Sequence, residues 1–225
     1  MKNLKMIRIL FLKDLFLSRW ILFAYLIGGL ASCAIGAIPN PTMGFISLIL
    51  IVTVAVGAGM YLLGDLLIGE GSENTRSFIM SLPVSLRDYS LAKISVVLTV
   101  FMIPWVMMLA FSIFMIVVLP GEKLGAIPLT IVIFLELLAA FTVQLVAAAI
   151  TESLGWTISV MVGCNVFFNV FLMTLMSRPE VSESAKSEVL SWPTFLAQVA
   201  GFELLIVVVA IAVAIIFQSR KRDLV

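Results

Sequence analysis

The chain has 225 residues, of which 62% are hydrophobic and 12% are charged, and its formal net charge is +1. Soluble domains have about a quarter charged residues, so this composition and a mean hydropathy of +1.21 indicate a membrane protein. The chain has no histidine and no Gly-x-x-x-x-Gly-Lys-Ser/Thr run, which argues against histidine catalysis and against a phosphate-binding loop of its own. We therefore expect neither a self-sufficient enzyme nor a nucleic-acid-binding protein.

The amino-terminal arm, residues 1–18, predicts an amphipathic helix on the inner membrane surface. Apolar residues recur there at helical spacing, and the charged residues, Asp14 among them, fall largely on other faces. Such a helix is either a simple anchor or an elbow that frames the cytoplasmic mouth of a transporter. The apolar positions are Leu4, Ile7, Phe11 and Leu15.

The stretch Leu30-Ala31-Ser32-Cys33 resembles a lipoprotein cleavage site. A signal peptide normally begins with a short basic region, whereas a helix-like arm that contains Asp14 precedes this stretch. We expect an uncleaved first span. The second cysteine, Cys164, is far away in another apolar run, so no disulfide framework or metal knuckle is predicted.

Six continuously apolar segments are each long enough to cross a bilayer as a helix. Their continuous character disfavours a β-barrel. Pro104 predicts a kink or strong tilt in the third span, and the small residues of the second span, Ala55, Gly57, Ala58 and Gly59, predict close helix packing. The fold class is therefore an all-α membrane protein, a single domain over 1–225, with spans at 20–38, 45–63, 94–119, 129–150, 154–176 and 197–217.

The distribution of Lys and Arg predicts the orientation of the spans. Eleven of them lie in the amino-terminal arm, the second-to-third connection and the carboxyl tail, and three lie on the other side. By the positive-inside rule, both termini are expected in the cytoplasm of a bacterial-type plasma membrane.

The connection at 69–93 is the one sizeable cytoplasmic loop, and it is unusually apolar. Pro83 ends a short helix, and Ser85 is expected to cap the helix that enters the third span. Phe78, Ile79 and Leu82 share one face of the short helix. That face either lies on the membrane surface or docks into a groove of another protein.

The residues of this connection resemble the signature of ABC-2 type transporter permeases, in which it also falls between the second and third spans. The opening residues, KNLKMIRILFLKDLFLSRW, are similar to the start of small members of that family. The matching residues are Glu73, Thr75, Leu82-Pro83-Val84-Ser85, Tyr89 and Lys93.

The resemblance implies a dimeric exporter in which each permease binds a separate cytoplasmic ATPase subunit. ATP and Mg would be bound by that partner and not by this chain. The second permease copy would be identical or a sibling, and membrane lipid surrounds both. The loop helix would be the coupling helix that docks into the ATPase, through Glu73, Arg76, Phe78, Ile79 and Leu82, with Pro83, Ser85, Tyr89 and Lys93 as the loop signature.

Two glutamates stand within the predicted spans at a similar distance from the outer end, Glu136 and Glu203. Carboxyl groups are costly in lipid, so they usually face protein or water or become protonated. They would line a substrate path or pair across the dimer, or else serve as packing contacts near the interface. Asn165 and Asn169, one turn apart, are weaker members of such a path, and interhelical hydrogen bonding is the expected role for them and for Gln144.

The outer connection at 177–196 contains Val181, Ala185, Val189 and Trp192 at helical spacing. This pattern predicts a short amphipathic helix, although a solvated loop fits nearly as well. The family resemblance implies that the segment caps the exit.

An ATP-driven exporter of an amphipathic peptide, antibiotic or lipid-like substrate is the leading interpretation. The alternative is an ion-coupled secondary transporter that uses Glu136 and Glu203, although no inverted repeat is evident. An intramembrane enzyme is remote, because the chain has neither histidine nor a Gly-x-Ser-x-Gly elbow.

Overall fold

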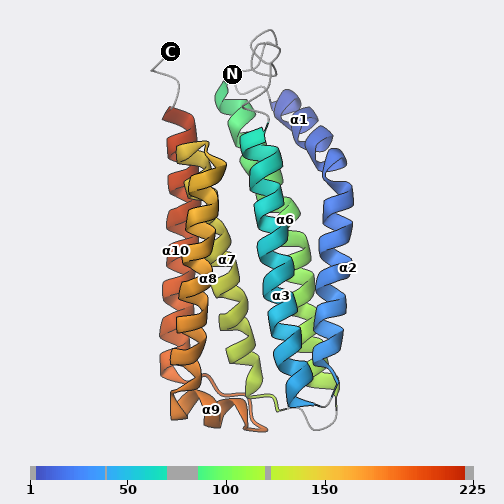
Figure 1. The fold of residues 1–225 in the computed structure, drawn as a ribbon, viewed down its shortest axis with the longest axis vertical. Coiled ribbons are helices and arrows are strands. Elements are labelled where there is room, and N and C mark those ends of the chain that lie inside the picture. The colour runs from blue at the N-terminus through green and yellow to red at the C-terminus, as the bar shows by residue number, and fades with distance from the viewer. Residues whose placement is uncertain (1–3, 39, 70–85, 120–122, 221–225) are drawn as a thin grey trace.

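The computed structural model describes residues 4–38, 40–69, 86–119 and 123–220, and these form a bundle of long helices (Figure 1). The described residues contain no strand, so the all-α prediction is confirmed. The elements are α1 (Leu4–Leu17), α2 (Arg19–Gly36), α3 (Pro41–Leu62), the π-helix η1 (Leu63–Gly69), α6 (Leu86–Val118), α7 (Ala126–Thr151), α8 (Leu154–Met176), α9 (Pro179–Ala185) and α10 (Thr194–Arg220).

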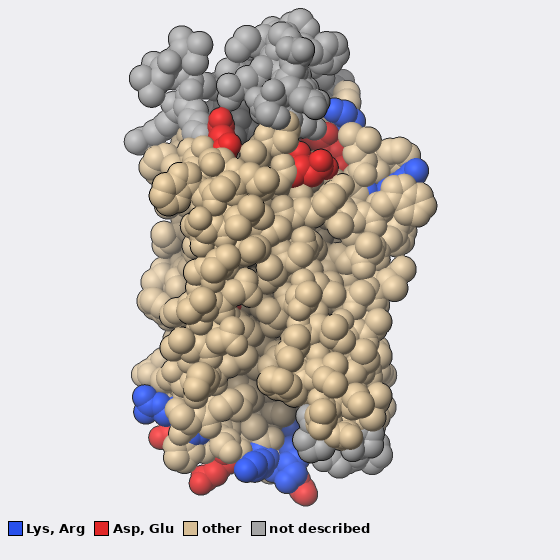
Figure 2. All heavy atoms as spheres, in the orientation of Figure 1, with Lys and Arg blue, Asp and Glu red and all other residues tan. Residues whose placement is uncertain are grey.

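Six helices of the described chain are long and apolar enough to cross a membrane: α2, α3 with η1, α6, α7, α8 and α10. The prediction of six spans is thus confirmed. On the face drawn in Figure 2, charged side chains gather at the two ends of the molecule, and the long middle region is uncharged. This distribution matches a hydrocarbon core flanked by two polar interfaces.

The bundle has two sides (Figure 1): α2, α3 and α6 lie on one, and α7, α8 and α10 lie on the other. The most extensively packed pairs are α7 with α10 and α2 with α3, while α6 contacts helices of both sides. The start of α1 and the end of α10 lie at one end of the bundle, and α9 lies at the opposite end. We call these the terminal end and the α9 end.

Small residues let α3 approach its neighbours, as expected, but not at every predicted position. Ala55 and Ala58 are buried, and a Cβ on Gly59 would lie 3.1 Å from the ring of Phe141. A Cβ on Gly57 would meet nothing within 4 Å, so this glycine faces away from the bundle and the prediction for it is wrong.

Helix α6 runs without interruption through Pro104, so the proline does not end it. The next residue, Trp105, donates an indole hydrogen bond to the carbonyl oxygen of Phe134 in α7 at 2.9 Å. One turn earlier, Phe101 stacks on Phe141 with ring centroids 3.6 Å apart. These contacts join the two sides of the bundle at its middle; a kink at Pro104 stays a prediction.

Helix α1 forms over the predicted arm and packs mainly against α6. Ser18 separates it from α2, and α1 is inclined to α2 there (Figure 1). The expected placement of Asp14 away from the apolar face is wrong, because its side chain is 3% exposed. Asp14 follows Ile7 by seven residues and Phe11 by three, so helical spacing already puts it on the apolar face that α6 covers.

The outer helix is shorter than predicted. Helix α9 ends at Ala185, so Val181 is buried while Val189 is 70% exposed and Trp192 is also exposed. A hydrogen bond links the segment just after α9 to the start of α7: the backbone N–H of Gly125 donates to the carbonyl oxygen of Ser187 at 3.0 Å.

Candidate functional site

Most of the predicted docking segment lies outside the described residues. This applies to Glu73, Arg76, Phe78, Ile79, Leu82, Pro83 and Ser85. Tyr89 falls in the first turns of α6, but its side chain is not described. The structure therefore describes the two ends of the connection, and the predicted apolar face lies outside the described residues.

Those two ends are tied to each other. The last residues before the connection form η1, and π-helices are rare elements that occur frequently at functional sites. Lys93, predicted as part of the loop signature, lies inside α6, which begins at Leu86, as expected for a helix that starts after Ser85 and enters the third span. Its side chain is 6% exposed, and its Nζ donates to the carbonyl oxygen of Leu66 in η1 at 2.6 Å.

We call this arrangement the connection base: η1, the first turns of α6 and the contact from Lys93 to Leu66. Leu63, Leu66 and Leu67 of η1 are buried, and η1 packs against both α6 and α7. Helix α1 packs against α6 as well, and it begins at the same end of the bundle. A displacement of the connection would therefore act directly on α3 and α6.

The second group of predicted residues forms a buried layer between α7 and α10. Glu136 follows the start of α7 by ten residues, and Glu203 follows the start of α10 by nine, so both lie about 14–15 Å along their helices. Both helices begin at the α9 end, which places the two carboxyl groups at matching depth. Their side chains are 5% and 2% exposed, respectively.

Glu136 lies close enough to Glu203, and to the thiol of Cys164 in α8, for electrostatic interaction. Neither carboxyl oxygen of Glu203 has a hydrogen-bond partner among the described residues. The described part of the chain gives neither glutamate a salt-bridge partner. A buried charge without partners is strongly unfavourable, so this layer suits a bound proton or cation better than two bare carboxylates.

The asparagines of α8 do not join this layer by hydrogen bonds. The Asn165 amide donates to the carbonyl oxygen of Met161 at 3.0 Å, and the Asn169 amide donates to that of Asn165 at 2.8 Å. Both bonds stay within α8, contrary to the expected bonds between helices, and Asn169 is exposed on the bundle surface. Gln144 is buried in α7, but its Oε1 has no partner among the described residues.

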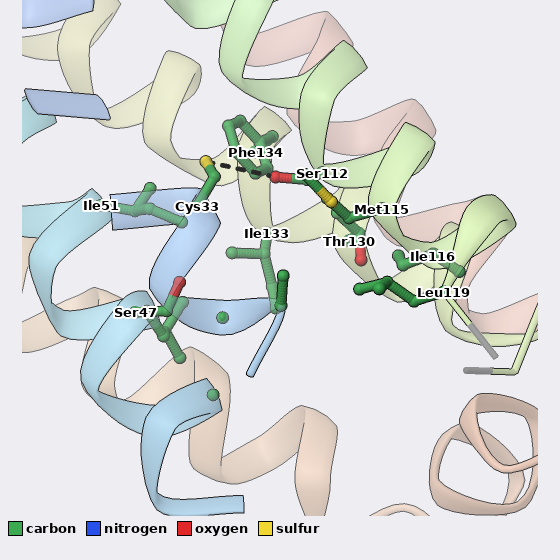
Figure 3. A pocket seen from close by; sticks show the side chains of 14 residues that line it. Cys33, Ser47, Ile51, Ser112, Met115, Ile116, Leu119, Thr130, Ile133 and Phe134 are labelled. Atoms are coloured by element: carbon green, nitrogen blue, oxygen red, sulfur yellow. Dashed lines mark hydrogen bonds between the residues drawn. The ribbon is translucent and has the colours of Figure 1, made fainter. Parts of the chain in front are cut away.

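A cavity near the α9 end was not foreseen from the sequence (Figure 3). It has an empty volume of about 710 Å³, counting open space at its mouth, and its walls come from α2, α3, α6 and α7. Cys33, buried within an unbroken α2, lines it beside Ser112. No local pattern could have revealed this cavity, because it depends on how four helices are placed.

Comparison of the chain with models of protein families, with curated proteins and with solved structures finds no match. A proposal about function therefore depends on the geometry of the connection base and the glutamate layer, together with the sequence resemblance.

Proposed function

We propose that this chain is the permease subunit of an ATP-driven ABC exporter, which moves an amphipathic substrate across the membrane with energy from a separate ATPase subunit. The observation that carries the proposal is the connection base. A long connection, for which the sequence predicts a helix with an apolar face, joins the second and third spans, and buried contacts fix the described ends of this connection to the bundle.

The connection base gives a physical route for coupling. A partner that binds the connection and moves it would pull on η1 and on the start of α6 together, because Lys93 links them. Since η1 continues α3 and α6 contacts both sides of the bundle, the displacement would reach the spans. The chain makes and breaks no covalent bond in this mechanism; nucleotide and Mg belong to the partner.

The predicted apolar face of Phe78, Ile79 and Leu82 explains why a partner is needed. An exposed apolar helix face on a connection is a common docking element, since burial of its side chains supplies the binding free energy. In this proposal Glu73 and Arg76 flank the face and set its register on the ATPase. A second permease copy, identical or a sibling, completes the transport path.

A pull-down of the tagged chain from its native host tests the proposal. We expect a stoichiometric ATPase subunit with the unmodified chain and its loss with Phe78→Asp. Val189→Asp is a matched control, because it places the same charge on an exposed apolar site at the α9 end. The proposal fails if the unmodified chain brings no ATPase, or if Phe78→Asp retains it fully.

An ion-coupled secondary transporter is the second candidate, and the glutamate layer favours it. Two neighbouring buried carboxyl groups, one of them without a hydrogen-bond partner among the described residues, resemble the intramembrane acidic sites that bind ions or protons. Transport by the purified chain in vesicles without ATP, abolished by Glu203→Gln, would support this candidate and contradict the first.

A further inference from the structure

The cavity near the α9 end runs along the helices rather than across them. Its wall in α3 extends from Gly44 to Ile51, and its wall in α6 extends from Ser112 to just beyond the helix, at Leu119. Seven residues of helix correspond to about 10 Å. The lining therefore starts near the helix ends and reaches into the apolar band, and we call this cavity the slot.

The side-chain hydroxyls of the cavity lining are already engaged within the chain. The hydroxyl of Ser47 donates to the carbonyl oxygen of Ser32 at 2.7 Å, and that of Thr130 donates to Ala126 at 3.0 Å. The hydroxyl of Ser112 contacts the sulfur of Cys33 at 3.5 Å. The remaining lining is largely aliphatic. A polar ligand would thus lose its bonds to water without gaining equivalent ones.

The occupant must therefore be apolar along its length. An extended peptide fails this condition, because its backbone N–H and C=O groups would be unsatisfied in such a lining. An acyl chain satisfies it, and the bilayer around the six spans supplies acyl chains at this depth. The gain is one of packing, since a void forfeits dispersion contacts that a flexible hydrocarbon chain restores.

We propose that the slot lined by Gly44, Ser47, Ile51, Ser112 and Ile133 binds one acyl chain of a membrane phospholipid, whose headgroup stays at the bilayer surface. The site lies at the opposite end of the bundle from the connection base and requires no ATPase. It can therefore be tested, and can fail, independently of the proposed function.

The test uses the purified full chain in phosphatidylcholine nanodiscs. These contain increasing mole fractions of a phosphatidylcholine with a photoreactive diazirine at the end of one acyl chain. After irradiation, mass spectrometry maps the adducts. A specific site is occupied by one chain, so adducts on the slot should saturate at a low mole fraction. Adducts on Val166 and Val170, which are exposed on α8, should rise in proportion to the probe.

A pair of glycine variants sharpens the test. Gly44 lines the slot and Gly57 does not, yet both lie in α3 and a Cβ on either meets nothing within 4 Å. We expect Gly44→Leu to lower slot adducts about tenfold, a change that corresponds to about 1.4 kcal/mol, and Gly57→Leu to leave them unchanged.

Three results would overturn the proposal. Slot adducts that rise in proportion to the probe, as on α8, would show bulk lipid only. Slot adducts that a folded Gly44→Leu variant leaves unchanged would show that the slot is not their source. An absence of slot adducts at every mole fraction would mean that something else, such as a second copy of the chain, fills the cavity. If Gly44→Leu does not fold, the titration of the unmodified chain decides alone.

Discussion

Among single residues, Gly125 has the most sharply defined requirement. Its φ of −65° is ordinary, so backbone conformation does not demand glycine there. Space does: a Cβ would lie 1.9 Å from the carbonyl oxygen of Ser184, a backbone atom of the segment that carries α9. We expect Gly125→Ala to lower the free energy of unfolding by about 1–3 kcal/mol, the usual cost of overpacking, measured by thermal unfolding in mild detergent.

Gly163→Ala is the matched control for Gly125→Ala. Gly163 lies inside α8, where a Cβ would meet nothing within 4 Å. Alanine is the better helix former by about 1 kcal/mol, so this variant should be as stable as the unmodified chain or more so. Equal unfolding midpoints for the two variants would contradict the contact between Gly125 and Ser184.

Glu203 presents the opposite case, a residue whose replacement should stabilise the fold. Both of its carboxyl oxygens are buried without a hydrogen-bond partner among the described residues. A buried polar group without a hydrogen bond costs about 1–3 kcal/mol, and an apolar side chain of similar size removes this cost. We expect a higher thermal unfolding midpoint for Glu203→Leu in detergent, and a lower midpoint would mean that the carboxyl group has a stabilising partner.

Transport by the same variant separates the two roles of Glu203. If it belongs to a substrate or ion path, Glu203→Leu should be more stable but inactive, because selection has kept a costly group for its function. If Glu203 is only a packing residue, activity should survive. Glu188→Leu, an exposed change at the α9 end, controls for the loss of one negative charge.

At the level of elements, the contact between α6 and η1 should govern how often the π-helix opens. Lys93→Met keeps the length of the side chain but removes the donor to Leu66. Bonds from charged donors contribute about 1.5–3 kcal/mol, so we expect faster amide hydrogen exchange across η1. Ser95→Ala is the control, because Ser95 bonds only to its own helix at Leu91 in the described contacts. Unchanged exchange in η1 would exclude the coupling role of this contact.

The spans were predictable because each depends on local composition alone. A run of about 20 apolar residues must be helical in a bilayer, and the structure places α8 at the predicted 154–176. The end of α9 was not predictable, because it depends on which neighbour covers a position, and helical spacing within one segment does not contain that information. The burial of Asp14 could have been predicted, because helical spacing puts it on the face of Ile7 and Phe11.

In the candidate site, too, some features follow from the sequence of one helix and others depend on how helices pack together. Glu136 and Glu203 could be matched in depth from the sequence, because residue number fixes position along a helix. The hydrogen bond from Lys93 to Leu66 and the slot could not, because each joins helices that are distant in sequence. Lys93 was singled out only through the family resemblance, which says nothing of its contact with η1.

For the whole molecule, the orientation in the membrane is the prediction with the widest consequence. The fold puts the turn between α7 and α8 at the terminal end and α9 at the other (Figure 1). The excess of Lys and Arg in segments of the terminal end predicts that this end is cytoplasmic. In a chain with Cys33 and Cys164 replaced by serine, a membrane-impermeant thiol reagent should label Glu188→Cys in intact cells. It should label Thr151→Cys only after permeabilisation.

The two single-cysteine variants control for each other, since both introduced positions are exposed and they lie at opposite ends of the bundle. The reversed labelling pattern would put the connection base outside the cell. A cytoplasmic ATPase could not then reach the connection, and the exporter proposal would fail whatever the pull-down gave. The acyl-chain slot would survive such a reversal, because it needs only a bilayer leaflet at the α9 end and not a particular side of the membrane.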